Sequence, residues 1–146
     1  METTTPTDRF AQGSLTLTAP RQGLHEITGD VAGWVSAQGI GSGLLTLFLR
    51  HTSASLLIQE NWDDDVQHDI ETFFARLVPE ELSLYTHVSE GADDMPAHIK
   101  GALTQTHLAI PVADGAMLLG RYQGIYLFEH RRRTRPRELV LHLQGR

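Results

Sequence analysis

The segment GSGLLTLFLR, residues 41–50, constrains the fold more than any other stretch because its apolar residues occupy both alternating faces of an extended chain. These apolar residues are Leu44, Leu45, Leu47, Phe48 and Leu49. Apolar and polar residues alternate in a strand that faces water on one side, whereas a continuous apolar run is typical of a strand covered on both sides. We therefore predict a strand buried on both faces, with SLLIQE (55–60) as its partner.

Short strand-like segments make up much of the remaining chain. They are residues 14–19, 24–27, 107–112, 116–120, 125–130 and 138–143. Asp114-Gly115 between two apolar runs predicts a hairpin turn. Because strands and helices do not alternate as in βαβ units, the pattern favours the α+β class. We predict a single domain over residues 9–146, with a largely antiparallel β-sandwich-like core and two or three packed helices, after a flexible lead over residues 1–8.

Three segments have helical features. Residues 30–39 predict a short helix, and residues 66–77 predict a longer one whose apolar residues recur at helical spacing. Asn61 or Asp63 is expected to cap the longer helix. A third helix is expected to start at Pro96, because proline is tolerated in a first turn. Its expected inward-facing residues are Ile99, Ala102 and Leu103.

Composition narrows the classes of function. The chain contains no cysteine, which excludes disulfides and thiolate metal ligands. Eleven acidic residues and a single base lie within residues 60–94, whereas six arginines lie within residues 121–137. The basic segment alone suggests nucleic acid, but the net charge of −6 and the lack of aromatic residues in RRRTRPR favour a solvated turn or pairing with acidic groups of another subunit. No apolar run reaches the length of a membrane span, and we expect a cytoplasmic protein that binds neither nucleic acid nor membranes.

Polar groups stand at both ends of HTSASLLIQENWDDD, residues 51–65. His51 and Ser53 follow the apolar strand, where a side chain can be displayed rigidly, although a histidine satisfied by nearby hydroxyls is equally consistent. An acidic group follows at the other end: Glu60, Asn61, Asp63, Asp64 and Asp65. Helix capping accounts for one or two of these residues. Crowded carboxylates favour a bound cation, Mg²⁺ or Ca²⁺ with oxygen ligands alone, and Zn²⁺ or Mn²⁺ with histidine added.

Two further segments hold candidate site residues. In EGADDMPAHIK (90–100), Asp93 and Asp94 precede a helix start, where they can serve as caps or as functional groups. His98 in the first turn should resist protonation, which suits a neutral ligand or a base, and Lys100 can reach a phosphate or remain solvated. In IYLFEH (125–130), Glu129 shares a face with the apolar residues of its strand. An inward carboxylate needs a partner, so Glu129 is either a functional group or an edge residue at the strand's exit.

Four segments in this order resemble the YjbQ-like family, whose members are also described as secondary thiamine-phosphate synthases. The segments are HTSASLLIQENWDDDV, EGADDMPAHIK, IPVADGAMLLGRYQGIYLFEH and VLHLQG. The resemblance implies a YjbQ-like α+β fold and a homotrimer with clefts between subunits. It also implies thiamine-phosphate synthase activity, in which hydroxymethylpyrimidine diphosphate and thiazole phosphate are joined and pyrophosphate is released. Trp62, Asp64 and Arg121 depart from the family pattern and bear on substrate specificity.

The leading hypothesis is a transferase acting on phosphorylated small molecules with a divalent metal, Mg²⁺ or Zn²⁺. Its predicted catalytic residues are His51, Glu60, Asn61, Asp63, His98 and Glu129. Its predicted substrate-contacting or cofactor-contacting residues are Ser53, Lys100 and Gln123. Its predicted metal ligands are His51, Asp65, Asp94 and His98. The alternatives are a metal-dependent hydrolase or other transferase at the same site, and a non-catalytic ligand-binding trimer.

Overall fold

The computed structural model describes residues 8–146, so most of the lead segment predicted over residues 1–8 lies outside the described residues. The elements in chain order are β1 (Arg9–Leu17), β2 (Gly23–Glu26), α1 (Thr28–Ala37), β3 (Gly43–Leu49), β4 (Ala54–Glu60), α2 (Asp64–Leu77), η1 (Leu82–Leu84), α3 (Asp94–Leu103), β5 (His107–Ala113), β6 (Ala116–Met117), β7 (Gln123–Glu129) and β8 (Arg137–Gly145). None of the helices within this described range is both long and apolar enough to span a membrane.

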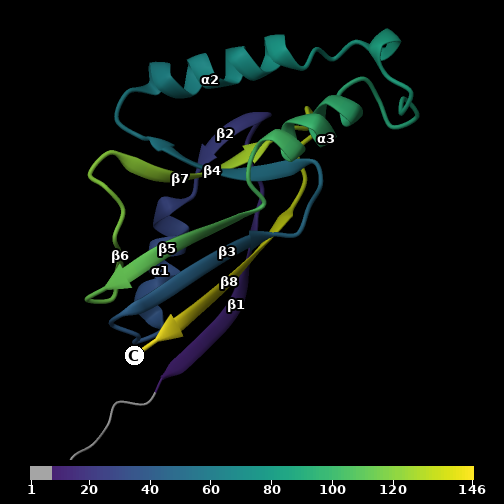
Figure 1. The fold of residues 1–146 in the computed structure, drawn as a ribbon. Coiled ribbons are helices and arrows are strands. Elements are labelled where there is room, and N and C mark those ends of the chain that lie inside the picture. Colours follow the sequence, from purple (N-terminus) through teal and green to yellow (C-terminus); the bar gives the residue numbers. More distant parts are fainter. Residues whose placement is uncertain (1–7) are drawn as a thin grey trace, which may run out of the picture.

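Two antiparallel sheets form the molecule (Figure 1). The larger sheet has the order β1-β8-β3-β5-β6, and the smaller sheet has the order β2-β7-β4. α2 lies over the smaller sheet, and α3 lies near one end of β4. This arrangement confirms the predicted α+β class with an antiparallel core and packed helices.

The core fills the space between the two sheets. β3 and β8 contribute fully buried leucines, β7 contributes Ile125 and Leu127, and α1 adds Val31 and Val35. A smaller apolar cluster lies on the other side of the second sheet, where Phe74 of α2 contacts Phe128 of β7 edge-to-face. β7 therefore lies between two apolar layers, as its almost continuous burial indicates.

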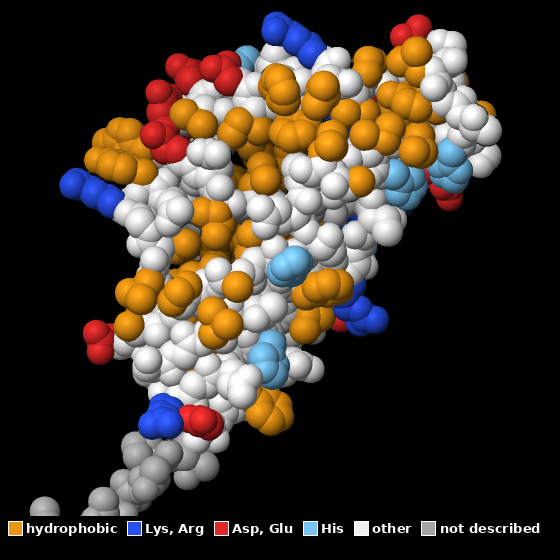
Figure 2. All heavy atoms as spheres, in the orientation of Figure 1, with side chains coloured by type: hydrophobic (Ala, Val, Ile, Leu, Met, Phe, Trp, Pro, Cys, Tyr) orange, Lys and Arg blue, Asp and Glu red, His pale blue; other side chains and the backbone are white. Residues whose placement is uncertain are grey.

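The pairing predicted for the central strand is wrong. β3 pairs with β5 and β8, whereas β4 pairs with β7 in the other sheet. The expectation that β3 is buried on both faces is also wrong for the single chain, because Leu44 and Phe48 are 48% and 47% exposed. Figure 2 shows hydrophobic and histidine side chains on the outer face of this sheet, which is turned toward the viewer. Sequence alternation cannot distinguish burial by the same chain from burial by another copy.

Local sequence signals predict where the helices lie, but they do not always predict which face of a helix is buried. α2 starts after Asp63, whose side chain accepts a hydrogen bond from the backbone N–H of Asp65, as an N-cap does. The inward face predicted for α3 is wrong: Leu103 is exposed, while Asp94 and Lys100 are buried. The predicted hairpin turn is confirmed, since Asp114 and Gly115 both have positive φ, at 51° and 75°.

Candidate functional site

The amino end of β4 meets the end of β7 and the start of β8 in a buried polar network. Ala54 is opposite Glu129 in the β4–β7 register, and the Ser53 carbonyl accepts a hydrogen bond from the backbone N–H of His130 at 3.3 Å. Arg137, the first residue of β8, donates from Nε to Glu129 Oε1 at 2.8 Å and also pairs with Oε2. Both side chains are buried, with Glu129 0% and Arg137 1% exposed. The prediction that an inward Glu129 needs a partner is confirmed.

Ser53 completes the coordination of this buried arginine. Its hydroxyl accepts from Arg137 Nη1 at 3.0 Å, and its carbonyl accepts from Nη2 at 3.2 Å. A buried ion pair is tolerated when further hydrogen bonds satisfy its remaining donors. The network therefore fixes the positions of the chain segments that enter β4 and β8.

His51 lies beside the network and is held in one tautomer. Its Nε2 accepts from the backbone N–H of Glu138 at 2.8 Å, so the neutral ring carries its proton on Nδ1, which lies 3.4 Å from Arg137 Nη1. Burial, and then the charge of Arg137, lowers the pKa of His51. A neutral His51 thus presents an Nδ1–H donor on the side of the guanidinium, where an anion would be a suitable acceptor.

His130, the residue after β7, is the second buried histidine at this end. Its Nε2 lies 2.8 Å from Ser55 Oγ, and its ring packs against Phe128 at 4.3 Å between centroids. Burial, and then the charges of Lys100 and Arg137, lowers the pKa of His130 to about 3. His130 is therefore a neutral structural residue over the physiological range.

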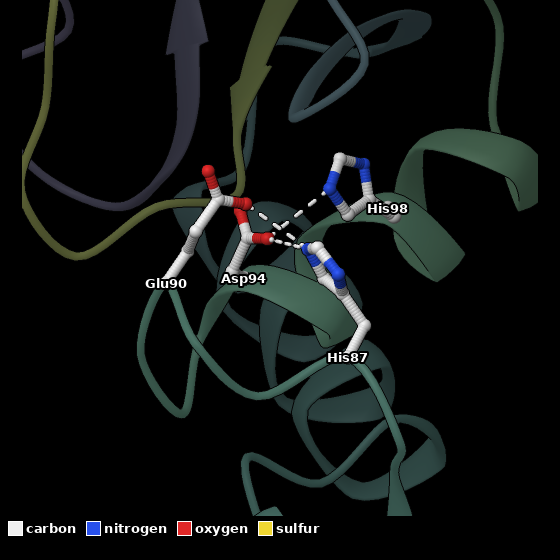
Figure 3. Close-up of side chains that lie close together, drawn as sticks. All are labelled: His87, Glu90, Asp94 and His98. Carbon is white, nitrogen blue, oxygen red and sulfur yellow. Dashed lines mark hydrogen bonds and ion pairs between the residues drawn. The ribbon is translucent and has the colours of Figure 1, made fainter.

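A second polar cluster surrounds the start of α3 (Figure 3). It comprises His87, Glu90, Asp94 and His98, each of which offers one ligand atom within 4.8 Å of the others. His87 Nε2 lies 2.7 Å from Asp94 Oδ2 and 3.0 Å from Glu90 Oε2, and His98 Nε2 lies 3.2 Å from the same Asp94 oxygen. We call this group the α3 cluster. Two imidazoles with two carboxylates form a ligand set suited to Zn²⁺ or Mn²⁺.

Arg131 orients the Asp94 carboxylate of the α3 cluster. It donates from Nε to Asp93 at 3.0 Å, from Nη2 to the Glu90 carbonyl at 3.0 Å, and from Nη1 to Asp94 Oδ1. Burial alone would raise the pKa of Asp94, but its hydrogen bond with His87 and the charge of Arg131 lower it. Asp94 thus remains a carboxylate with one oxygen on Arg131 and the other facing the two imidazoles.

The backbone of Thr52 links the α3 cluster to the network around Arg137. His98 Nδ1 lies 3.2 Å from the Thr52 carbonyl, to which it donates, and His51 and Ser53 flank that residue. A cavity of about 510 Å³ opens beside these residues and is lined by Arg50, His51, Arg135 and Arg137 among others. The structure therefore brings the predicted residues His51, Ser53, Asp94, His98 and Glu129 into one region.

Of the remaining predicted residues, Lys100 is buried on α3, and the others lie at the other end of β4. Glu60 is opposite Gln123 in the β4–β7 register, and Asn61 donates to Glu26 at 3.0 Å. Asp63 caps α2, and Asp65 is exposed in its first turn. The seven residues of β4 span about 20 Å, so the two ends do not share a cleft within one chain.

Tyr126 belongs to this acidic end. Its hydroxyl accepts from Gln67 at 2.9 Å and donates to the Glu60 carbonyl at 3.3 Å. Burial, together with the charges of Glu26, Asp64 and Glu60, raises the pKa of Tyr126 to about 12.

Sequence reasoning missed four residues of the region around Thr52. His87 is not among the predicted site residues, and Glu90 falls within the acidic run of residues 60–94. Arg131 and Arg137 belong to the arginine-rich segment for which the sequence favours a solvated turn or pairing with another subunit. A signal was present for His87 and Glu90, because they lie three residues apart and shortly before Asp94 and His98. The distinct role of Arg137 follows only from tertiary contacts.

The family model described as UPF0047 protein YjbQ-like matches residues 13–146. The chain is a member of the UPF0047 YjbQ-like family. It is 47% identical over 139 residues to the UPF0047 protein sll1880 of Synechocystis, with 95% of each chain covered. It is 44% identical over 135 residues to the UPF0047 protein YjbQ of Escherichia coli O157:H7, with 92% of this chain and 97% of the relative covered.

A solved structure of a YbjQ-like protein of unknown function from Sulfolobus solfataricus P2 matches this UPF0047 chain with a TM-score of 0.83. The match covers 96% of this chain and 100% of the other, at 22% sequence identity, and so bears on the fold alone. The resemblance to the YjbQ-like family and its fold is thereby confirmed.

Proposed function

We propose that this UPF0047 protein is a metal-dependent enzyme that acts on phosphorylated small molecules, with the metal held by the α3 cluster. The observation that carries the proposal is the orientation of His98. Its Nδ1 donates to the Thr52 carbonyl, so the neutral ring directs the lone pair of Nε2 toward the Asp94 carboxylate. Two acceptors that face each other repel, and a cation or a proton between them removes the repulsion.

The surroundings of the cluster support a metal. Metal-bound histidines typically donate their second ring N–H to a carbonyl or carboxylate, as His98 does to Thr52. Ligating carboxylates are themselves hydrogen-bonded, as Asp94 is to Arg131. His87 and Glu90 complete a set of four candidate ligands. Of the metal ligands predicted from sequence, Asp94 and His98 belong to this set, whereas His51 contacts Arg137 and Asp65 lies on α2.

The neighbouring cavity supports a phosphorylated substrate. Arg50 and Arg135 line it together with the Nδ1–H side of His51, so the wall offers both positive charge and directed donors. A divalent cation beside this wall would supply charge neutralisation for a phosphate or diphosphate group. The family resemblance supports the finer proposal that this chemistry is thiamine-phosphate synthesis. A phosphate-ester hydrolase or other transferase is the second candidate, because the arginines that line the cavity can pair with the phosphate of any ester.

We further propose that the protein acts as a homotrimer. The outer face of the β1-β8-β3-β5 sheet exposes Phe10, Leu44 and Phe48, and the latter two come from the strand whose sequence predicts burial on both sides. Contiguous apolar patches on a soluble domain typically mark interfaces. Packing of copies on this face would bury them, and sedimentation showing a monomer would contradict this proposal.

Zinc titration calorimetry tests the metal site. The His98→Ala variant is expected to weaken zinc binding by at least about 100-fold, since loss of even an outer-shell partner typically costs about 10–100-fold. His68→Ala, which removes an exposed histidine of α2, serves as the matched control and should leave the affinity unchanged. Equal zinc affinity in the His98→Ala variant and the unaltered protein would exclude the α3 cluster as the metal site.

Turnover of the zinc-loaded and magnesium-loaded protein on the thiamine precursors and on a panel of phosphate esters then tests the reaction. Faster turnover of the precursors supports the synthase. Faster turnover of the esters supports the second candidate. No turnover of either class, with metal and ligand affinities retained, would support a non-catalytic binding protein instead.

A further inference from the structure

The single lysine of the 146-residue chain, Lys100, is buried. It lies on α3 and is 6% exposed, whereas Leu103 on the same helix is 56% exposed. Lysine is almost never fully buried unless it is paired. Hydropathy alone predicts an exposed lysine and a buried leucine on this helix, which is the reverse of what is observed. The helix is therefore oriented so that an ammonium group, in place of a leucine, points into the molecule.

No group of residues 8–146 makes an ion pair or a side-chain hydrogen bond with the Lys100 ammonium. Burial of an uncompensated charge is costly. A ligand that supplies a negative charge would remove this cost.

Lys100 lines a cavity of about 440 Å³ between α2 and the smaller sheet. Phe74 of α2 and Phe128 of β7 supply aromatic walls, and Ala75 and Val78 add apolar surface. A volume of this order is typical of sites that hold small organic ligands. None of the four residues of the α3 cluster lines this cavity, so it is distinct from the proposed metal site.

The other charged residues of the cavity wall already have partners. Both oxygens of Glu80 are engaged, one with Gln22 at 2.9 Å and the other with Arg132. Glu71 accepts from Arg21 at 3.0 Å. Glu129, which also lines the cavity, is neutralised by Arg137. The wall thus presents one unpaired positive charge beside two aromatic rings.

We propose that this cavity binds a small aromatic monocarboxylate, whose carboxylate pairs with Lys100 and whose ring packs against the contacting pair Phe74 and Phe128. One unpaired positive charge matches a monoanion better than a phosphate dianion. The aromatic rings provide the stacking or edge-to-face contacts that aromatic ligands favour. The proposal goes beyond the proposed function, because it assigns a second ligand site that requires no metal.

Calorimetric titration with benzoate tests the site, with benzamide as the neutral probe of the same shape and phenyl phosphate as the dianionic probe. We expect benzoate to bind at one site per chain, and at least about 10-fold more tightly than either other probe. Benzamide has no charge with which to pair the Lys100 ammonium, and phenyl phosphate brings a second negative charge for which the wall has no unpaired partner. Lys100→Met should weaken benzoate by at least about 10-fold while leaving benzamide unchanged. Arg133→Met removes one positive charge from an exposed position outside the cavity and should leave all three affinities unchanged.

A second readout does not depend on any variant. Because Lys100 is the single lysine, [15N]lysine labelling gives one side-chain resonance, which should shift on addition of benzoate. Absence of benzoate binding at millimolar concentration, equal binding of benzamide, or unchanged benzoate affinity in Lys100→Met would each overturn the proposal. Tighter binding of phenyl phosphate would also overturn it, by assigning the cavity to a phosphate ester.

Discussion

Both ends of β4 carry polar groups, but those at the amino end are buried and those at the carboxyl end are exposed to solvent. At the amino end, Glu129 and Arg137 are removed from water and compensate each other. At the carboxyl end, Asp63 and its acidic neighbours on α2 remain exposed, and their charges are screened by solvent. Sequence polarity alone made the two ends look equivalent. Burial makes the amino end sensitive to single substitutions, and the following predictions test that difference.

The largest effect is expected from Glu129→Gln. This change leaves the Arg137 guanidinium buried without a counter-ion, and breaking a buried pair typically costs about 3–5 kcal/mol. Urea unfolding of the variant measures the loss. The double variant Glu129→Leu/Arg137→Met removes both charges and should recover most of the lost free energy of unfolding. A loss below about 1 kcal/mol for Glu129→Gln would show that water reaches this end of β4.

The next effect concerns pH and His130. The pKa of His130 in the folded chain, about 3, lies below the ordinary histidine value of 6.5, so below pH 6.5 the unfolded chain binds a proton that the folded chain does not. This stability is present above pH 6.5 and is lost as pH falls, by about 1.4 kcal/mol per pH unit, or about 2–3 kcal/mol at pH 4.5. Urea unfolding between pH 7 and pH 4.5 measures the slope. The slope should flatten in His130→Phe and persist in the exposed control His68→Gln; an equal slope in all three proteins would contradict a buried neutral His130.

A smaller effect is expected at the acidic end from Asp63→Ala. This substitution removes the N-cap of α2, which is typically worth about 1 kcal/mol. Asp63→Asn retains a capping oxygen and should unfold at nearly the same urea concentration as the unaltered protein. If the two variants lose equal stability, the charge at this position matters more than the capping hydrogen bond.

The smallest effect on stability is expected from Glu60→Gln. The Glu60 side chain makes no ion pair or hydrogen bond with residues 8–146, so the change should stay within about 0.5 kcal/mol. Turnover sharpens the comparison. If Glu60→Gln lowers activity while stability and trimer assembly are unchanged, the acidic end of one copy reaches the α3 cluster of another. If activity is unchanged as well, the functional region is confined to the amino end.

Much of the fold could be predicted from local patterns. The period of apolar residues located α2, the Asp114-Gly115 pair located a hairpin turn, and the shared face of Ile125, Leu127 and Glu129 predicted an inward carboxylate. These features depend on contacts within a few residues. The partners of β3 could not be predicted, because the apolar pattern of one strand does not specify which other apolar strand it pairs with.

The candidate site was predicted only in part for a related reason. His51, Ser53 and Glu129 were identified because each stands at the end of an apolar strand, and Asp94 and His98 because they stand near a helix start. Nothing local distinguished Arg137 from the other arginines of its segment. Its importance comes from Glu129, 8 residues away, and from Ser53, 84 residues away, which only the folded chain brings into contact with it.

The sequence by itself determined the α+β class, the positions of most helices and strands, and the membership of the UPF0047 YjbQ-like family. Short-range periodicity and turn chemistry encode these properties. Only the tertiary structure decided that the two ends of β4 are separate, that α3 buries Asp94 and Lys100, and that Arg137 neutralises Glu129. The physical reason is that burial and charge compensation depend on which segments come into contact across the sheets, and the sequence pattern does not specify those tertiary contacts.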